Sequence, residues 1–281
     1  MSDDDRKPLA QVKTVIDGRE VTVQRDRWAL DVAREMGISI PTLCNHPALT
    51  PYGACRLCVV QVTKGKWTWL TTSCDLPIRE GLSISTDAPA VVQARKMALE
   101  MLWTQAPDAK EIRDLARQMG VEKPRFDNRL EDNKCILCGL CVRVCEKILG
   151  DSAIHFSHRG AKRDVTTPFG EPSETCIGCR ACEMICPTGH IVSRLEGSAL
   201  NISTWNTEVE MARCEQCGCV LMPVKEFEFI RARMGEKIRP EQLCQACRRQ
   251  KTAKQLSDIS TTSGWTAGQR QAKTAEPVTG D

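Results

Sequence analysis

The amino-acid sequence predicts an α+β chain made of several small modules rather than one large core. Aromatic residues make up only 4% of its 281 residues, which is too few for a large aromatic-filled core. The 17 cysteines fall into sets with short, regular spacing, and alternating apolar residues near the N-terminus indicate a β-hairpin. Domains with weak cores need metals or disulfides to fold. The cysteines are therefore expected to organise the modules.

These cysteines are expected to bind metal rather than to form disulfides. The segment MSDDDRKP at the N-terminus has no apolar stretch, and the chain has no run of about 18 apolar residues that could span a membrane. These features predict a cytoplasmic protein with no transmembrane segment. In a reducing cytosol, dense cysteines at C-x2-C spacing indicate metal sites. The net charge of +3 does not by itself indicate binding to nucleic acid, and none is predicted.

Residues 11–89, after an N-terminal tail over 1–10, are predicted to form a β-grasp domain. The segments VKTVID and REVTVQ alternate apolar and polar residues around Asp17-Gly18, which is a strong hairpin signal. A helix is expected over 28–37, ending at Gly37, and the apolar run VVQV indicates the next strand.

The loop before that strand carries the first cysteine set. Gly53 and Ala54 are small enough to let backbone N–H groups approach sulfur, which suits a 2Fe-2S cluster. A zinc site is the alternative, but zinc favours two tight knuckles and only one is present. His46 is expected to cap or line the loop, because the C-x2-H partner of a Rieske centre is missing. The predicted 2Fe-2S ligands are Cys44, Cys55, Cys58 and Cys74.

Residues 90–133 are predicted to form a helical spacer. The segment AVVQARKMALEMLW places one apolar face on a helix, and a second helix is expected over 109–119, ending at Gly120. The predicted face consists of Val91, Ala94, Ala98, Met101 and Leu102.

Residues 134–198 contain two copies of C-x2-C-x2-C-x3-C, the bacterial ferredoxin run. In this run three cysteines bind one cluster and the fourth reaches the other cluster. Zinc is disfavoured, because three ligands of one tetrahedral site would fall within seven residues. Glu146 replaces the usual proline after the first copy, and the long insertion between the copies is expected to form a β-hairpin. His155, His158 and His190 are expected on the surface or in loops rather than as ligands. The predicted ligands are Cys135, Cys138, Cys141 and Cys186 for the first 4Fe-4S cluster, and Cys176, Cys179, Cys182 and Cys145 for the second.

Residues 199–250 are predicted to form a zinc-ribbon-like module. Two C-x2-C pairs are separated by 26 residues, and Gly218 lets the first knuckle turn under a metal. The predicted ligands are Cys214, Cys217, Cys244 and Cys247. A rubredoxin-like iron would use the same four thiolates, and a further cubane would also involve Cys219, the unassigned cysteine. Residues 251–281 are polar and are predicted to form a flexible tail, in which Trp265 is a candidate contact point.

The first module resembles a specific family. The stretch IPTLCNHPALTPYGACRLCVVQV, followed by TSCDLPIREGLSISTDAP, is similar to the N-terminal 2Fe-2S domain of the electron-input subunit of complex I. The same domain begins the diaphorase small subunit of NAD-reducing hydrogenases and the accessory region of iron-only hydrogenases. Longer family members bind another 4Fe-4S cluster through a histidine and three cysteines in the spacer. Residues 101–134 contain neither residue type, so that cluster is predicted to be absent.

The sequence therefore predicts an electron-transfer subunit without catalytic residues. It has no Gly-rich nucleotide-binding fingerprint, no P-loop and no nucleophile-base pair. The resemblance, which covers residues 11–198, implies two partners: a flavin- and NAD(H)-binding subunit, and a metal-dependent hydrogenase, formate dehydrogenase or similar reductase. The alternatives are a free polyferredoxin and a multi-zinc interaction or nucleic-acid protein.

Overall fold

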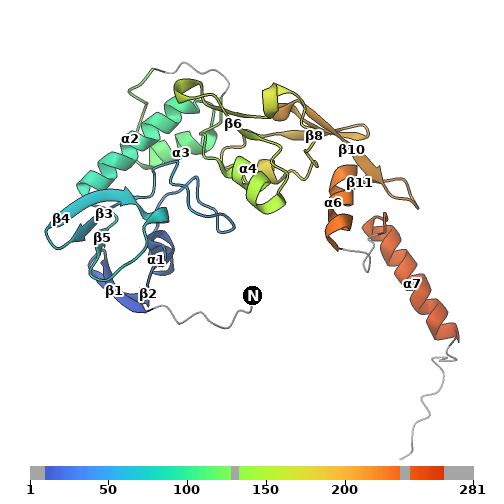
Figure 1. The fold of residues 1–281 in the computed structure, drawn as a ribbon, viewed down its shortest axis with the longest axis horizontal. Coiled ribbons are helices and arrows are strands. Elements are labelled where there is room, and N and C mark those ends of the chain that lie inside the picture. The colour runs from blue at the N-terminus through green and yellow to red at the C-terminus, as the bar shows by residue number, and fades with distance from the viewer. Residues whose placement is uncertain (1–9, 128–132, 235–240, 263–281) are drawn as a thin grey trace, which may run out of the picture. The chain divides into compact units, whose positions relative to one another are not determined.

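The computed structural model describes residues 10–127, 133–234 and 241–262, which belong to two compact units (Figure 1). The first unit comprises residues 1–196 with 200–209, and the second comprises 197–199 with 210–281. The elements of the first unit up to the dicluster region are β1 (Gln11–Ile16), β2 (Arg19–Gln24), α1 (Ala29–Glu35), β3 (Val59–Lys64), β4 (Trp67–Thr72), η1 (Ser73–Asp75), β5 (Ser83–Ser85), α2 (Pro89–Gln105) and α3 (Lys110–Gln118). They are followed by α4 (Leu140–Arg143), η2 (Val144–Leu149), β6 (His155–Ser157), η3 (Gly160–Lys162), β7 (Asp164–Thr166), η4 (Pro168–Gly170), α5 (Ala181–Met184), β8 (Ser193–Glu196), β9 (Ala199–Ile202), η5 (Ser203–Trp205), β10 (Thr207–Arg213), β11 (Val220–Pro223), α6 (Val224–Met234) and α7 (Gln245–Thr262).

The N-terminal module is a β-grasp sheet. Its five strands have the order β2-β1-β5-β3-β4, with β1 parallel to β5 and the other neighbours antiparallel. Asp17 and Gly18 both have positive φ, +46° and +75°, so the β1–β2 turn has the twist that two-residue hairpins favour. Helix α1 covers one face of the sheet through buried residues such as Leu30 and Val32, which belong to the same core cluster as Val60 and Val62. The predicted hairpin, helix and strand are confirmed.

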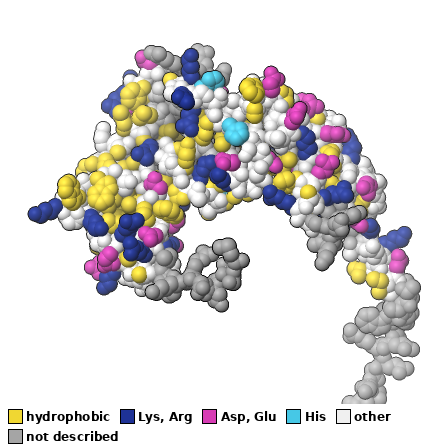
Figure 2. Space-filling view, viewed as in Figure 1, with side chains coloured by type: hydrophobic (Ala, Val, Ile, Leu, Met, Phe, Trp, Pro, Cys, Tyr) yellow, Lys and Arg dark blue, Asp and Glu magenta, His cyan; other side chains and the backbone are white. Residues whose placement is uncertain are grey.

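Strand β4 forms an edge of this sheet and exposes large apolar side chains. Trp67 is 78% exposed, and Trp69 and Leu70 are each about two-fifths exposed. Figure 2 shows hydrophobic side chains gathered over the β3–β4 hairpin. An exposed apolar edge strand is a potential pairing surface for another chain.

Helices α2 and α3 form the predicted spacer, but the predicted face of α2 is partly wrong. Met101 is 57% exposed, whereas Arg95 and Leu99 are buried. The buried stripe therefore follows the i, i+4 rows through Val91, Arg95 and Leu99. Arg95 was missed because its apolar stem packs inside while its guanidinium donates to the Val59 carbonyl, from Nε at 3.1 Å and from Nη2 at 2.7 Å.

The dicluster region is built from two short helices and a hairpin. Helix α4 continues into a π-helical turn, η2, which contains Cys145 and ends at Gly150 with φ +84°. The insertion between the two motifs forms the antiparallel β6–β7 hairpin, as predicted. The second motif enters α5.

The C-terminal module differs from a ribbon in its second cysteine pair. Strands β8 to β11 form a sheet in the order β11-β10-β9-β8, and the division between the two units falls within β10. The first cysteine pair follows β10, but Cys247 lies in the first turn of helix α7 rather than on a β-turn. Helix α7 continues to Thr262, so the first twelve residues of the predicted flexible tail are helical. Trp265 lies outside the described residues, as do residues 1–9 of the predicted N-terminal tail.

None of the helices in the described parts of the chain has the length and apolar character needed to cross a bilayer.

Candidate iron-sulfur sites

The first cysteine set is fully buried in the loop between α1 and β3 and in η1. Each of its four cysteines is at most 2% exposed. The thiols form two pairs, one of Cys44 with Cys55 and one of Cys58 with Cys74, in which each thiol is the largest influence on the pKa of its partner. Two pairs of thiols are the arrangement that two irons, each with two protein ligands, require.

Backbone N–H groups polarise this set. The Cys55 N–H donates to Cys44 Sγ at 3.3 Å, and the Leu43 N–H donates to Cys55 Sγ at 3.5 Å. Hydrogen bonds from Cys55, with backbone help from Ala54, lower the pKa of the Cys44 thiol to about 7. The bond from Cys74 lowers the pKa of the Cys58 thiol to about 7 as well. One thiol of each pair is thus prepared to become the thiolate that iron binds.

The rest of the loop agrees with its predicted roles. Gly53 has φ +67°, and a Cβ there would lie 3.2 Å from the Asp75 carboxylate, so the loop requires glycine at this position. His46 caps the loop, because its Nδ1 accepts the Ala48 N–H at 3.2 Å.

The eight cysteines of the ferredoxin motifs line two separate cavities in the first unit. One cavity contains the first three cysteines of the first motif together with the last cysteine of the second. The other contains the first three cysteines of the second motif together with the last cysteine of the first. The first cavity is lined by Cys135, Cys138, Cys141 and Cys186, and the second by Cys176, Cys179, Cys182 and Cys145.

Burial works against thiolate formation at these sites in the absence of metal. It raises the pKa of the Cys138 thiol to about 12, and it also raises the pKa of Cys135, Cys141, Cys145 and Cys182. A positively charged metal core restores the charge balance, because metal ions deprotonate the thiols that bind them. These buried thiols therefore fit a role as ligands of iron-sulfur clusters better than a role as protonated side chains of a metal-free core.

One residue of these cavities escaped the sequence prediction. Trp205, which is 3% exposed, lines both cavities, and its indole Nε1 is buried without a hydrogen-bond partner among the described residues. His190 lies in a loop, as predicted, where it lines the first cavity and is half-buried, and burial lowers its pKa. A single tryptophan between two strands carries no motif that would have identified it.

The 2Fe-2S loop and the first ferredoxin motif share one core. Cys44, Cys55 and Cys138 belong to the same cluster of buried residues, together with apolar side chains of α2 and α3. Arg143 donates to the Thr50 carbonyl and lies 5.2 Å from the centroid of the Tyr52 ring. The first cysteine set is therefore packed against the first of the two cavities.

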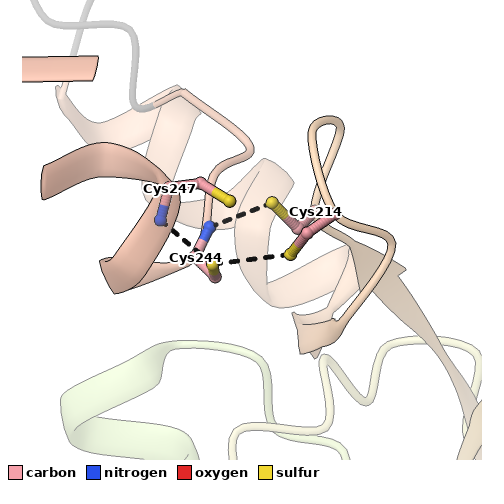
Figure 3. A group of neighbouring side chains, drawn as sticks. Cys214, Cys244 and Cys247 are labelled. Atoms are coloured by element: carbon pink, nitrogen blue, oxygen red, sulfur yellow. Dashed lines mark hydrogen bonds between the residues drawn. The ribbon is translucent and has the colours of Figure 1, made fainter. Parts of the chain in front are cut away.

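The C-terminal cysteines come together as predicted. The sulfur atoms of Cys214, Cys217, Cys244 and Cys247 all lie within 4.8 Å of one another. Figure 3 shows the side chains of Cys214, Cys244 and Cys247 pointing toward one another. Cys219 is exposed, and its thiol lies beside those of Cys217 and Cys244.

Two family descriptions match the chain. Residues 10–89 match the 2Fe-2S iron-sulfur cluster binding domain, and residues 134–190 match the 4Fe-4S dicluster domain. The first match contains the 2Fe-2S cysteine set, and the second contains both ferredoxin motifs. The C-terminal cysteines lie outside both matches.

Curated relatives share most of this region. The alpha subunit of NADPH-Fe(3+) oxidoreductase from Geobacter sulfurreducens is 30% identical over 65% of this chain and 24% of its own length. The G subunit of NADH-quinone oxidoreductase from Streptomyces coelicolor is 28% identical over 66% of this chain and 25% of its own length. The HndD subunit of NADP-reducing hydrogenase from Solidesulfovibrio fructosivorans is 28% identical over 66% of this chain and 36% of its own length. The chain thus spans about a quarter to a third of these relatives.

A solved structure supports the same relationship. A chain of an NAD+-reducing [NiFe]-hydrogenase crystallised in the H2-reduced state matches with a TM-score of 0.55 and 25% identity, covering 69% of this chain and 88% of that one. The resemblance predicted from the sequence is confirmed. Over the matched region, this chain is therefore similar to iron-sulfur subunits such as HndD, the alpha subunit of NADPH-Fe(3+) oxidoreductase and the G subunit of NADH-quinone oxidoreductase.

Proposed function

We propose that this chain is a non-catalytic relay subunit that carries electrons between a flavin- and NAD(H)-binding subunit and a catalytic, metal-dependent oxidoreductase subunit. The observation that carries the proposal is the packing of Cys44 and Cys55 of the 2Fe-2S set with Cys138 of the first ferredoxin motif in one buried core. Iron-sulfur clusters bound at such sites take up and release single electrons. The protein's own part is to hold the ligands close together and to exclude water from them.

The ligand assignment is part of this proposal. Cys44, Cys55, Cys58 and Cys74 would hold a 2Fe-2S cluster, and the two cavities would each hold a 4Fe-4S cluster with crossed ligation. The support is the pairing of thiols in the first set and the composition of the two cavities. The unpartnered Trp205 N–H beside both cavities further supports acceptor atoms there.

The partners follow from the relatives and from the surface. The relatives are named as subunits of NADH-quinone oxidoreductase, NADPH-Fe(3+) oxidoreductase and NADP-reducing hydrogenase. Each of these enzymes connects a nicotinamide cofactor to another electron acceptor or donor. Exposed Trp67 and Trp69 on the β4 edge also favour a subunit over a freely diffusing carrier. The cytoplasmic location and the predicted module boundaries, 11–89, 90–133, 134–198 and 199–250, remain predictions.

The C-terminal module is proposed to bind one zinc ion and to take no part in electron transfer. Its fold departs from the predicted ribbon, but its four thiols are the set that structural zinc uses.

Metal analysis of the native protein tests the function. A protein purified without oxygen should contain about ten iron atoms per chain and a visible absorption that dithionite bleaches. On size exclusion of the native extract it should elute with larger partners that oxidise or reduce NAD(P)(H). Elution as an isolated brown protein would favour the polyferredoxin alternative. A colourless protein with several zinc ions would exclude the relay.

A further inference from the structure

The C-terminal unit contains a tighter sulfur group than the three iron-sulfur sites. Cys217 Sγ and Cys244 Sγ lie 3.7 Å apart. Zinc–sulfur bonds of about 2.3 Å in a tetrahedron place the sulfurs about 3.8 Å from one another. Within the parts of the chain that the structure describes, the cysteines of the other three sets form no group this tight. A cubane needs room for four irons and four sulfides between its ligands, so the spacing fits a single ion.

Backbone donors prepare these thiols for a metal. The Cys244 N–H donates to Cys214 Sγ at 3.3 Å, and the Cys247 N–H donates to Cys244 Sγ at 3.4 Å (Figure 3). Because the second pair lies at the start of the 18-residue helix α7, the positive end of the helix also favours thiolates.

The unit has little else to hold it together. Among its described residues, the buried ones are Ala212, Cys214, Pro223, Phe227 and Cys247, so two of the five are ligands. A module with so few buried apolar side chains needs a metal to fold.

We infer that Cys214, Cys217, Cys244 and Cys247 bind one zinc ion, and that this ion fastens the end of β10 to the start of α7. This inference deepens the proposed metal-binding module by making the ion its structural centre. Cys219 lies outside the four-sulfur group, so it is not assigned as a ligand.

Metal analysis and limited proteolysis of the full chain, in the Cys247→Ser and Cys219→Ser variants, test the inference. The wild type should contain one zinc ion. Cys247→Ser should lose the zinc, keep all the iron, and be cleaved in the C-terminal unit at least tenfold faster, whereas Cys219→Ser should match the wild type. A loss of iron in Cys247→Ser would show an iron site and overturn the zinc assignment. A loss of zinc in Cys219→Ser would overturn the ligand set. A protein with one zinc and no other metal would contradict the relay proposal but leave this inference standing.

A second observation concerns Trp205, which lies between the two 4Fe-4S cavities. Its backbone is fixed, because the Thr207 hydroxyl donates to the Trp205 carbonyl at 2.9 Å and accepts the Ser173 N–H at 3.3 Å. The buried indole N–H has no well-formed hydrogen bond among the described residues. An unsatisfied buried donor is unfavourable, so an acceptor is expected within reach.

The acceptor is indicated by the cavities that Trp205 lines. Each cavity contains four cysteine sulfurs, and Ile202, from the strand before Trp205, lines the second one. The indole N–H is therefore buried beside the sulfurs of these sites.

We propose that Trp205 is a positioning residue of the two 4Fe-4S sites, where its N–H donates to a ligand sulfur at one of them. Hydrogen bonds to ligand sulfur favour the more negative, reduced state and raise the reduction potential. The proposal rests on the relay function, and it assigns a role to a residue outside both matched domains.

The test is a redox titration, followed by electron paramagnetic resonance, of Trp205→Phe with Trp69→Phe as the control. Phenylalanine keeps most of the apolar contact and removes the donor. The equilibrium constant for reduction of one 4Fe-4S cluster should fall about tenfold, which is about 59 mV for one electron. The control, which changes an exposed tryptophan, should leave both potentials unchanged. If Trp205→Phe keeps its full iron content and both reduction potentials are unchanged, this role is overturned and the relay proposal is unaffected. The role is also overturned if the variant loses one cluster and the reduction potential of the remaining cluster does not shift.

Discussion

At the scale of single residues, Cys145 decides whether the two ferredoxin motifs are interlocked. It belongs to the first motif in sequence but lines the cavity of the second, and the Ala153 N–H donates to its sulfur at 3.3 Å. Because it lies in the π-helical turn η2, its carbonyl accepts from the Gly150 and Asp151 N–H groups, which sets the direction of the side chain.

We expect Cys145→Ala to remove the second 4Fe-4S cluster and to spare the first. Iron should fall from about ten to about six atoms per chain, because a four-iron cluster loses one of its four ligands. The measurement is iron analysis with electron paramagnetic resonance, and Cys179→Ala should give the same residual spectrum. If Cys145→Ala instead matched Cys135→Ala, each motif would bind its own cluster.

Gly139 is a second residue with a large structural role, because three segments of the first unit meet at its Cα. It has φ +72°, and a Cβ there would lie 3.0 Å from Cζ of Phe156 in the β6–β7 hairpin and 3.2 Å from Cε1 of Tyr52 in the 2Fe-2S loop. The guanidinium carbon of Arg163, also in the hairpin, lies 3.9 Å from the centroid of the Phe156 ring and packs against it.

Gly139→Ala should therefore lower stability through two effects. The left-handed backbone costs about 1–2 kcal/mol for a residue with a side chain, and the crowding costs about 1–3 kcal/mol more. Gly160→Ala is the matched control, because Gly160 has φ +57° but nothing within 4 Å of a Cβ, so only the first cost applies. The temperature at which cluster absorbance is lost should fall further for Gly139→Ala. Equal losses would mean that Phe156 and Tyr52 move aside freely.

At the scale of elements, local patterns predicted what depends on local chemistry. Asp17-Gly18 predicted the first hairpin because a tight turn needs two residues that tolerate positive φ. Gly120, with φ +69°, ends α3 for the same reason. Cysteine spacing predicted which sulfurs would meet, since short spacings leave the chain few ways to surround a metal.

The elements that the sequence did not predict depend on contacts made by distant residues. Arg95 is buried because its guanidinium donates hydrogen bonds to the Val59 carbonyl of β3. The sequence of α2 contains no pattern from which this distant acceptor could be predicted. Helix α7 extends through a polar segment whose residues 251–259 are all exposed, so it has no apolar periodicity to identify it. Trp205 lies far along the chain from the first motif, and it reaches the cavities only through the return of the chain from β9 to β10.

At the scale of the whole molecule, the first unit brings its sites together in a definite order. Cys44 and Cys55 of the 2Fe-2S set share a buried core with Cys138 of the first ferredoxin motif. Burial, with a contribution from the nearby Cys55, raises the pKa of the Cys138 thiol. The second cavity is joined to the first through Trp205, which lines both. The proposed order of the relay is therefore 2Fe-2S, first 4Fe-4S, second 4Fe-4S.

This order predicts which reduced clusters should be magnetically coupled. The electron paramagnetic resonance signal of the reduced 2Fe-2S cluster should be broadened by the first 4Fe-4S cluster, because their ligands pack in one core. Removing the first cluster with Cys138→Ala should sharpen that signal and slow its relaxation relative to the wild type. Removing the second cluster with Cys179→Ala should leave the 2Fe-2S signal broadened, because the intervening cluster remains. The reverse result would place the second cluster next to the 2Fe-2S site, and electrons would then have to pass from the N-terminal module to the second motif before reaching the first.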